Sequence, residues 1–501
     1  MAEIKKVLIA NRGEIALRVI RTCRELGKQA VAVYSEPDAY APHVLHADES
    51  VYIGPAESAQ SYLHMDKIIE AAKQTGADAI HPGYGFLSEN AAFAERCNRE
   101  GIIFIGPGPK AMRLMGDKTA ARQLMSKAGV PFPPGTTKEL GDIAEARRVA
   151  KEIGFPVLIK AAAGGGGKGM RIVDREEEFE SGIRAARSEA RNAFGDNRVY
   201  IEKYLAEPRH VEFQIIADTH GNVLHLFDRE CSIQRRHQKV IEEAPCTILT
   251  PALRAEMAEA AVSAARACDY VGAGTIEFLV DNDRNFYFLE MNTRLQVEHP
   301  VTELITGFDL VALQISVAEG KPLPFRQEEV EINGHAIECR IYAEDPQDSF
   351  LPSTGTLAKH RIPSGNGIRV DAGVEEGQEV TINYDPMISK LCAFGRDREE
   401  AIARMLRALD EYEIAGCRTT IPFCRYVLNH EAFRTGMYDT HFVPDHFSPA
   451  GLDSKAEDEW LNVKAIAASL LKIHNGQEEK SSVHYVPDAS LRVSNWWKNR
   501  R

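Results

Sequence analysis

Short apolar runs alternate with helix-period segments over the first third of this 501-residue chain. The runs 7–10 and 30–34 predict two strands, and the residues between them follow a helical period. Further strand–helix units continue to about residue 105, which predicts a doubly wound, mostly parallel, Rossmann-like α/β sheet. The first strand-to-helix turn, at 11–13, lacks the GxGxxG fingerprint, so this shape does not by itself indicate a dinucleotide site.

A proline-rich break at 130–135 is followed by a different pattern, in which strand-like stretches lie close together with short turns. This spacing predicts an antiparallel α+β domain with a long helix at 251–268. A third region, about 333–446, combines short strands with a helix expected at 398–411. The strands expected in the second region are 156–160, 170–173, 199–202, 211–217, 223–228, 275–280 and 286–291.

Charge and cysteine content exclude several classes of protein. The chain has 60 basic and 73 acidic residues, a net charge of −13, which argues against a nucleic-acid binder. Apolar runs stay short of the ~18 residues that a membrane-spanning helix needs, and no secretory signal is expected. The nine cysteines form no CxxC pair, which indicates reduced thiols and a cytoplasmic location.

A glycine run, Gly164–Gly167, lies between Lys160, at the end of a predicted strand, and Lys168. Glycines let backbone N–H groups approach phosphate oxygens, and the lysines supply positive charge. The run is not a Walker loop, because Gly169 follows Lys168 where that motif requires Ser or Thr. The alternative interpretation is the mobile tip of a hairpin.

Two glutamates fall opposite each other in a predicted hairpin. If 275–280 and 286–291 pair so that Val280 faces Tyr287, Glu277 lies across from Glu290. Such a pair repels unless a cation lies between the carboxylates, and Asn292 adds an oxygen on the same face. Three hard oxygen ligands suit Mg²⁺. The alternative is a pair of solvated strand carboxylates.

Polar residues after this hairpin and before it extend the candidate site. Arg294 offers a fork of donors to an oxyanion, and Glu298 is a candidate general base, unless the two form an ordinary surface ion pair. The basic stretch 228–239 predicts an anion pocket or, alternatively, a solvated loop. On the strand before it, His210 and Glu212 are expected on one face.

The order of these features is that of ATP-grasp enzymes, and four stretches closely resemble biotin carboxylase, which carboxylates biotin at the expense of ATP. They are 9–16, 81–90, 234–239 and 290–300, and the similarity runs from about residue 3 to 445. The resemblance implies an N-terminal domain at 1–115, an ATP-grasp domain at 116–332 with a lid at about 132–204, a C-terminal domain at 333–446 and an extension at 447–501.

The resemblance also implies roles for individual residues. Glu277, Glu290 and Asn292 would bind Mg²⁺ or Mn²⁺, with Lys239, Arg294 and the Val297 backbone at bicarbonate. Glu298 would be the base, and Arg340 would face the ureido oxygen of biotin. The implied ATP contacts are Lys118, Lys160, Gly164, Gly165, Gly166, Gly167, Glu202, Lys203, Tyr204, Leu205, His210, Gln234, His237, Glu277 and Glu290.

Partners follow from the same resemblance. The sequence has no Met-Lys-Met biotinylation motif, so biotin is expected on a separate carrier protein. The further partners expected are a second copy of the chain, in a homodimer, and a carboxyltransferase subunit. The expected assembly is an acetyl-CoA or other acyl-CoA carboxylase, with fatty acid biosynthesis as its context, and a two-subunit pyruvate carboxylase is the alternative. The extension, with adjacent Trp496 and Trp497, is expected to bind a partner or else to fold back on its own domain.

Two other classes of protein fit the sequence less well than biotin carboxylase. A different ATP-grasp ligase is disfavoured by Arg340 and the 81–90 stretch. An inactive scaffold is disfavoured because Lys160, Glu277, Glu290 and Glu298 are all present.

Overall fold

The computed structural model describes residues 3–136, 142–161 and 170–452. Its N-terminal region is a five-stranded parallel sheet in the order β3-β2-β1-β4-β5, which confirms the predicted alternation. Segments that follow neighbouring parallel strands meet at one edge of such a sheet, and here Asn11 donates to the carbonyls of Pro82 and Tyr84 at 2.8 and 2.7 Å. The elements are β1 (Lys6–Ile9), α1 (Gly13–Glu25), β2 (Gln29–Ser35), α2 (Pro42–His46), β3 (Glu49–Gly54), α3 (Met65–Thr75), β4 (Ala79–His81), α4 (Ala91–Arg99) and β5 (Ile103–Phe104).

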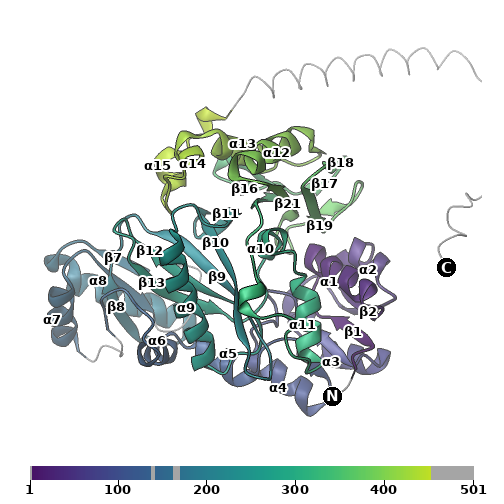
Figure 1. Cartoon of the computed structure of the whole chain (residues 1–501), viewed down its shortest axis with the longest axis horizontal. Helices are drawn as coiled ribbons and strands as arrows, with labels where there is room; N and C mark the ends of the chain where they lie inside the picture. The colour runs from purple at the N-terminus through teal and green to yellow at the C-terminus, as the bar shows by residue number, and fades with distance from the viewer. Residues whose placement is uncertain (1–2, 137–141, 162–169, 453–501) are drawn as a thin grey trace, which may run out of the picture. The chain divides into compact units, whose positions relative to one another are not determined.

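An eight-stranded antiparallel sheet follows, in the order β13-β12-β9-β10-β11-β14-β21-β19. In Figure 1 the helix α9 (Pro251–Ala267) lies along this sheet, and it packs against β9, β10 and β12. The pairing of β11 with β14, from Ile241↔Cys339 to Ala244↔Ala336, carries the sheet across the expected boundary near residue 333. The strands are β9 (Arg209–Ala217), β10 (Val223–Arg235), β11 (Gln238–Ala244), β12 (Gly272–Val280), β13 (Phe286–Asn292), β14 (His335–Tyr342), β19 (Ile368–Ala372) and β21 (Met387–Gly395).

A smaller three-stranded antiparallel sheet, β7-β6-β8, has an apolar core of its own. Its strands are β6 (Val157–Ala161), β7 (Met170–Val173) and β8 (Val199–Lys203), with α7 (Ile143–Ile153) and α8 (Glu176–Phe194) packed together and against them. The predicted glycine run falls between β6 and β7, outside the described residues. Two helices, α5 (Pro109–Gly116) and α6 (Lys118–Lys127), precede this module.

The region after β14 joins the central sheet through both its core and a buried carboxylate. The predicted helix is α12 (Arg398–Glu411), whose Ala401, Ile402 and Met405 pack into the same apolar cluster as β14 and β21. The remaining elements are α10 (His299–Thr306), α11 (Leu310–Ala318), β15 (Glu344–Asp345), β16 (Leu351–Pro352), β17 (Gly355–Thr356), β18 (Lys359–Arg361), β20 (Glu379–Val380), β22 (Glu413–Ala415), α13 (Ile421–Asn429), α14 (Glu431–Thr435) and α15 (Phe442–His446).

Glu243, on β11, is that buried carboxylate. It accepts a hydrogen bond from His335 at 2.7 Å and two from Arg398, at 2.6 and 3.0 Å. The hydroxyl of Tyr438 donates to it as well. These contacts tie three later segments of the chain to one central strand.

Among the described residues, no single helix is long and apolar enough to cross a membrane. The helices α10 and α11 pass such a test only as a pair bent by 95°, and most of their residues are buried in the protein core.

Replacing Glu243 should make the stability of the folded chain vary less with pH between pH 7 and pH 3. Burial alone would raise the pKa of Glu243, but His335 and Arg398 lower it from 4.5 to about 2. Because the folded pKa lies below the unfolded one, the stability that this carboxylate contributes is complete above about pH 4.5 and is lost as the pH falls toward 2. Glu243→Gln should therefore lower the unfolding midpoint strongly at pH 7 and much less at pH 3.

The midpoints are measured by thermal unfolding at pH 7, 5, 4 and 3. Glu413→Gln is the control, because that partly exposed carboxylate pairs with Arg361 at the surface, where ion pairs contribute about 0–1 kcal/mol. An equal difference between wild type and Glu243→Gln at pH 7 and pH 3 would contradict the assignment.

Candidate active site

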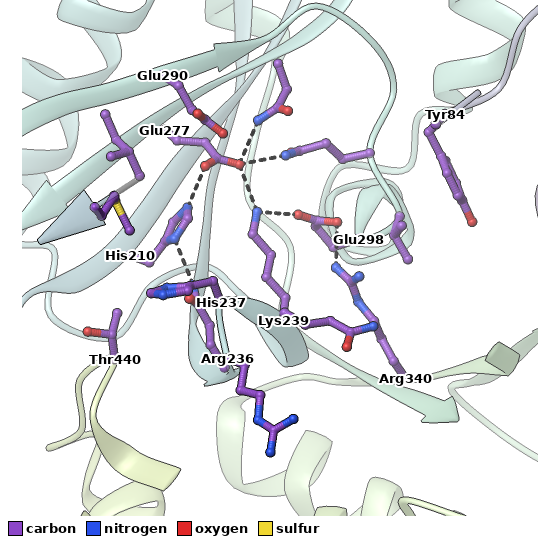
Figure 2. A pocket seen from close by; sticks show the side chains of 18 of the residues that line it. Tyr84, His210, Arg236, His237, Lys239, Glu277, Glu290, Glu298, Arg340 and Thr440 are labelled. Carbon is purple, nitrogen blue, oxygen red and sulfur yellow. Dashed lines mark hydrogen bonds and ion pairs between the residues drawn. The ribbon is translucent and has the colours of Figure 1, made fainter. Parts of the chain in front are cut away.

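One pocket of about 1500 Å³ gathers residues from segments that follow strands of the N-terminal sheet, from both antiparallel sheets and from the region after β14. Figure 2 shows His210, Glu277, Lys239, Glu298 and Arg340 pointing toward one another in this pocket, whereas Arg236 points away from them. The predicted site residues that line it are Lys160, Glu202, Lys203, Tyr204, Leu205, His210, Gln234, His237, Lys239, Glu277, Glu290, Asn292, Arg294, Val297, Glu298 and Arg340. The side chain of Lys118 and the glycines Gly164–Gly167 lie outside what the structure describes.

The two predicted metal carboxylates, Glu277 and Glu290, are opposite each other on β12 and β13. The prediction was right about this pair and wrong about the turn, where Val280 faces Phe286 rather than Tyr287. A β-bulge between Glu277 and Phe278 absorbs the difference of one residue and restores the expected pairing. The bulge lies beside the site, where such irregularities often aim a side chain.

Glu277 receives hydrogen bonds and charge from several sides. The amide nitrogens of Asn292 and Gln296 each donate to its Oε1 at 2.8 Å, and His210 Nε2 lies 3.0 Å from its Oε2. Burial opposes ionisation, yet Lys239 and His210 hold the pKa of Glu277 well below its usual range. A carboxylate kept ionised in a buried pocket fits a divalent cation, and facing Glu290 it supplies the hard oxygen atoms that Mg²⁺ prefers.

His210 and Glu212 share one face of β9, as predicted, and both point to Glu277. Single ligand atoms of these three residues lie within 4.8 Å of one another. Gln234 Nε2 lies 2.8 Å from His210 Nδ1, which fixes the orientation of the imidazole. Asn292 turns its amide oxygen away from Glu277, accepting from Arg294 at 2.8 Å, so a metal-binding role for that oxygen requires the amide to turn.

Lys239, on β11, is the central cation of the pocket. Its ammonium group contacts Glu212 at 2.5 Å, Glu298 at 2.6 Å and Glu277 at 2.9 Å. Three carboxylates therefore converge on one largely covered lysine, whose pKa lies well above its ordinary value: desolvation lowers it, but the surrounding anions raise it more. The lysine links Glu277, the predicted metal ligand, to Glu298, the candidate base.

Glu298 lies between two cations. Its Oε1 accepts from Lys239, and its Oε2 accepts from Arg340 at 2.9 Å. Burial alone would raise the pKa of Glu298, but Lys239 and Arg340 bring it far below its usual range, so the group is ionised in this arrangement. Arg340 also donates to Glu242 at 2.6 Å, a contact that the sequence did not predict.

Two of the predicted ATP contacts, Lys160 and Glu202, have opposite charges and pair with each other. Lys160, at the end of β6, forms a buried ion pair with Glu202 on β8. Glu202 begins the segment 202–205 that lines the pocket. At the far side, His237 lies in the two-residue turn between β10 and β11, where Arg236 and His237 have φ values of 48° and 68°. Such left-handed residues suit tight hairpin turns, and non-glycine examples are frequent at functional sites.

The basic stretch 228–239 is neither a loop nor uniformly an anion pocket. It forms the end of β10, the turn and the start of β11. Arg229 is completely buried, and Arg235 pairs with Glu344 at 2.6 Å. Only part of the stretch faces the pocket, namely Gln234, Arg236, His237, Gln238 and Lys239.

Arg229 donates to five side chains, a role that the sequence did not reveal. Its partners are Glu212 at 2.7 Å, Gln214 at 2.7 Å, Thr302 at 2.8 Å, Gln296 at 2.7 Å and Thr275 at 3.2 Å. Glu212 is therefore shared between Arg229 and Lys239, and Gln296 between Arg229 and Glu277. The arginine fixes the groups that contact the reactive carboxylates.

Three family models match the chain in succession. They are the biotin carboxylase N-terminal domain over residues 3–112, the ATP-binding domain of the carbamoyl-phosphate synthase L chain over 117–326, and the biotin carboxylase C-terminal domain over 338–445.

Relatives with different names are similarly close. The mitochondrial methylcrotonoyl-CoA carboxylase alpha chain of Dictyostelium discoideum is 55% identical over 480 residues, covering 95% of this chain and 68% of the relative. One pyruvate carboxylase subunit from Methanothermobacter thermautotrophicus is 56% identical over 441 residues, covering 88% and 90%. Biotin carboxylase 1 of Bacillus subtilis is 53% identical over 441 residues, covering 88% and 98%. The chain spans 62–68% of five alpha chains of methylcrotonoyl-CoA and propionyl-CoA carboxylases.

Solved structures agree over most of the chain. A Campylobacter jejuni biotin carboxylase, in a β,γ-ATP complex, has a TM-score of 0.86 at 51% identity, covering 89% of this chain and 99% of its own. The biotin carboxylase domain dimer of the Hydrogenobacter thermophilus 2-oxoglutarate carboxylase, bound to MgADP, ADP and bicarbonate, has a TM-score of 0.85 at 49% identity, covering 90% and 99%. On this evidence, the chain belongs to the biotin carboxylase family.

Proposed function

We propose that the chain carboxylates biotin with bicarbonate and ATP, through carboxyphosphate. The observation that carries the proposal is the unbroken series of contacts from Glu277 through Lys239 and Glu298 to Arg340. It joins a carboxylate suited to a phosphate-bound metal with an arginine suited to an oxyanion, inside one pocket. Such a site can make an unstable intermediate at one end and use it at the other.

The proposed roles follow the charges of the pocket. Lys239, Arg294 and the N–H of Val297 hold bicarbonate, and ionised Glu298 removes its proton. Bicarbonate attacks the γ-phosphorus of ATP, releasing ADP and forming carboxyphosphate. Mg²⁺, held by Glu277 and Glu290, would neutralise phosphate charge. Lys160, His210, Gln234 and His237 bind the nucleotide, together with residues 202–205, Lys118 and the glycine loop.

The second half of the proposed reaction, the carboxylation of biotin, depends on Arg340. Carboxyphosphate breaks down to CO₂ and phosphate, and phosphate takes the N1′ proton of biotin. The guanidinium of Arg340 stabilises the enolate oxygen that develops on the ureido group, and N1′ then attacks CO₂. Because Arg340 also contacts Glu298, the two half-reactions meet at one ion pair. Carboxyphosphate would hydrolyse in bulk water, so the proposed reaction requires the pocket to be closed to water while this intermediate exists.

We further propose an acyl-CoA carboxylase as the complete assembly, with a pyruvate carboxylase as the second candidate. The support is the length of this chain that each alignment covers. Three alignments that cover 95–98% of the chain are with methylcrotonoyl-CoA and propionyl-CoA carboxylase alpha chains. The alignments with two biotin carboxylases and the pyruvate carboxylase relative cover 88%, as do those with the mouse and rat methylcrotonoyl-CoA carboxylase alpha chains. The proposed partners are a biotin carrier, a second copy of the chain and a carboxyltransferase subunit. The role of 447–501 in binding a partner stays a prediction, because that extension lies almost wholly outside the described residues.

Removing Arg340 should abolish carboxylation without preventing nucleotide binding. Wild-type chain should hydrolyse ATP when bicarbonate, Mg²⁺ and free biotin are all supplied. Arg340→Ala should lower this turnover about 10²–10³-fold, the size of effect seen when one oxyanion donor is lost. Nucleotide affinity, measured by calorimetry with MgADP, should change little.

Arg235→Ala is the matched control, because Arg235 also belongs to a buried ion pair but lies outside the proposed site. It should retain turnover. Normal carboxylation of free biotin by Arg340→Ala would rule out the proposed role.

The acceptor is identified by reconstitution. Tagged chain is isolated from its native host with its bound partners, and the complex is assayed with labelled bicarbonate and each of acetyl-CoA, propionyl-CoA, methylcrotonoyl-CoA and pyruvate. We expect label in an acyl-CoA. Label in pyruvate alone would reject the acyl-CoA assembly while leaving biotin carboxylation intact.

A further inference from the structure

A second cation, Arg122, lies behind the Lys160–Glu202 ion pair. Arg122 is on α6, and its Nη1 donates to Glu202 Oε2 at 2.8 Å, while Lys160 contacts the other carboxylate oxygen. The side chains of Arg122, Glu202 and Lys160 are 9%, 4% and 8% exposed. One buried anion is thus neutralised twice, and only one of the two cations lines the pocket.

Aromatic rings hold Arg122 in place. The centre of its guanidinium lies 5.0 Å from the ring centroid of Tyr200 and 5.1 Å from that of Phe132. Cation–π contacts of this kind stabilise a charge that is partly removed from water. Asp117 caps the helix that carries Arg122, accepting from Thr119 and Ala120 at 2.9 Å. The arginine is therefore fixed on the far side of Glu202.

The proposed nucleotide contact of Lys160 competes with its ion pair to Glu202. Its ammonium group must approach a phosphate, yet in this structure it is paired with Glu202. If Lys160 were the sole partner of that carboxylate, turning away would leave an unpaired buried charge, which is strongly unfavourable. With Arg122 on the other oxygen, Glu202 keeps one charged hydrogen bond throughout the exchange.

We propose that Arg122 is a positioning residue that releases Lys160 to the nucleotide by keeping Glu202 neutralised. The inference rests on the proposed nucleotide role of Lys160 and deepens it. Arg122 does not line the pocket and acts on the nucleotide only through Glu202. The same two contacts predict that nucleotide affinity depends on Arg122 only while residue 202 carries a charge.

The test is a double-mutant cycle on nucleotide binding, measured by calorimetry with MgADP. Arg122→Met should raise the dissociation constant about tenfold, the scale of losing one hydrogen bond to a charged group. Turnover at saturating ATP should change much less, because Arg122 contacts no reacting atom. Because residues 202–205 are themselves proposed to bind the nucleotide, the reference for the double variant is Glu202→Gln alone. Adding Arg122→Met to Glu202→Gln should change affinity little, since no buried anion then holds Lys160.

Arg254→Met is the control, because Arg254 forms a similar 2.6 Å ion pair with buried Asp228, away from the pocket. Thermal unfolding of each variant checks that the chain is folded, and Arg122→Gln replaces Arg122→Met if the latter is not recovered. Unchanged affinity in Arg122→Met overturns the inference. So does a loss on adding Arg122→Met that is as large in the Glu202→Gln background as in wild type, or an equal loss in Arg254→Met. A wild-type chain that binds no MgADP would instead overturn the proposed function.

Discussion

The ion pair between Arg229 and Glu212 is the contact on which the rest of the pocket depends. Both side chains are wholly buried, so the charges persist only because each finds several partners. Glu212 also forms an ion pair with Lys239, and Lys239 in turn orients Glu277 and Glu298 through ion pairs of its own. Removing Glu212 would take from the buried Arg229 the carboxylate that it pairs with, at a cost of about 3–5 kcal/mol, whereas removing Arg229 would leave Glu212 with Lys239.

This arrangement sets which groups are free to react. Lys239 has three carboxylate partners, so losing one of them to a metal or a substrate still leaves it paired. Arg229 has its hydrogen bonds satisfied within the protein and is not a pocket-lining residue. The cations of this region are therefore of two kinds. Arg229 is held by protein groups alone, whereas Lys239 lines the pocket and can contact a ligand. The same division distinguishes Arg122 from Lys160.

The sequence predicted what depends on local periodicity. The order of strands and helices in the N-terminal sheet and the facing pair Glu277 and Glu290 both follow from the period of the side chains. The bulge was missed because a one-residue irregularity leaves no pattern of its own. The partners of Glu202 and Arg340 were missed because they lie 80 and 98 residues away, so only the folded chain brings them together.

The presence of two separate antiparallel sheets has an evolutionary consequence. Lys160 and Glu202 belong to the three-stranded sheet with its own core, whereas Glu277, Lys239 and Arg340 belong to one continuous eight-stranded ladder. Because His210, Gln234 and Glu277 also lie in the second sheet, the proposed nucleotide contacts are divided between the two sheets. Substitutions in the first sheet can change some of these contacts without altering the spacing of Lys239 and Arg340 in the second. Selection can therefore adjust part of the proposed nucleotide site while the groups proposed for carboxylation keep their places.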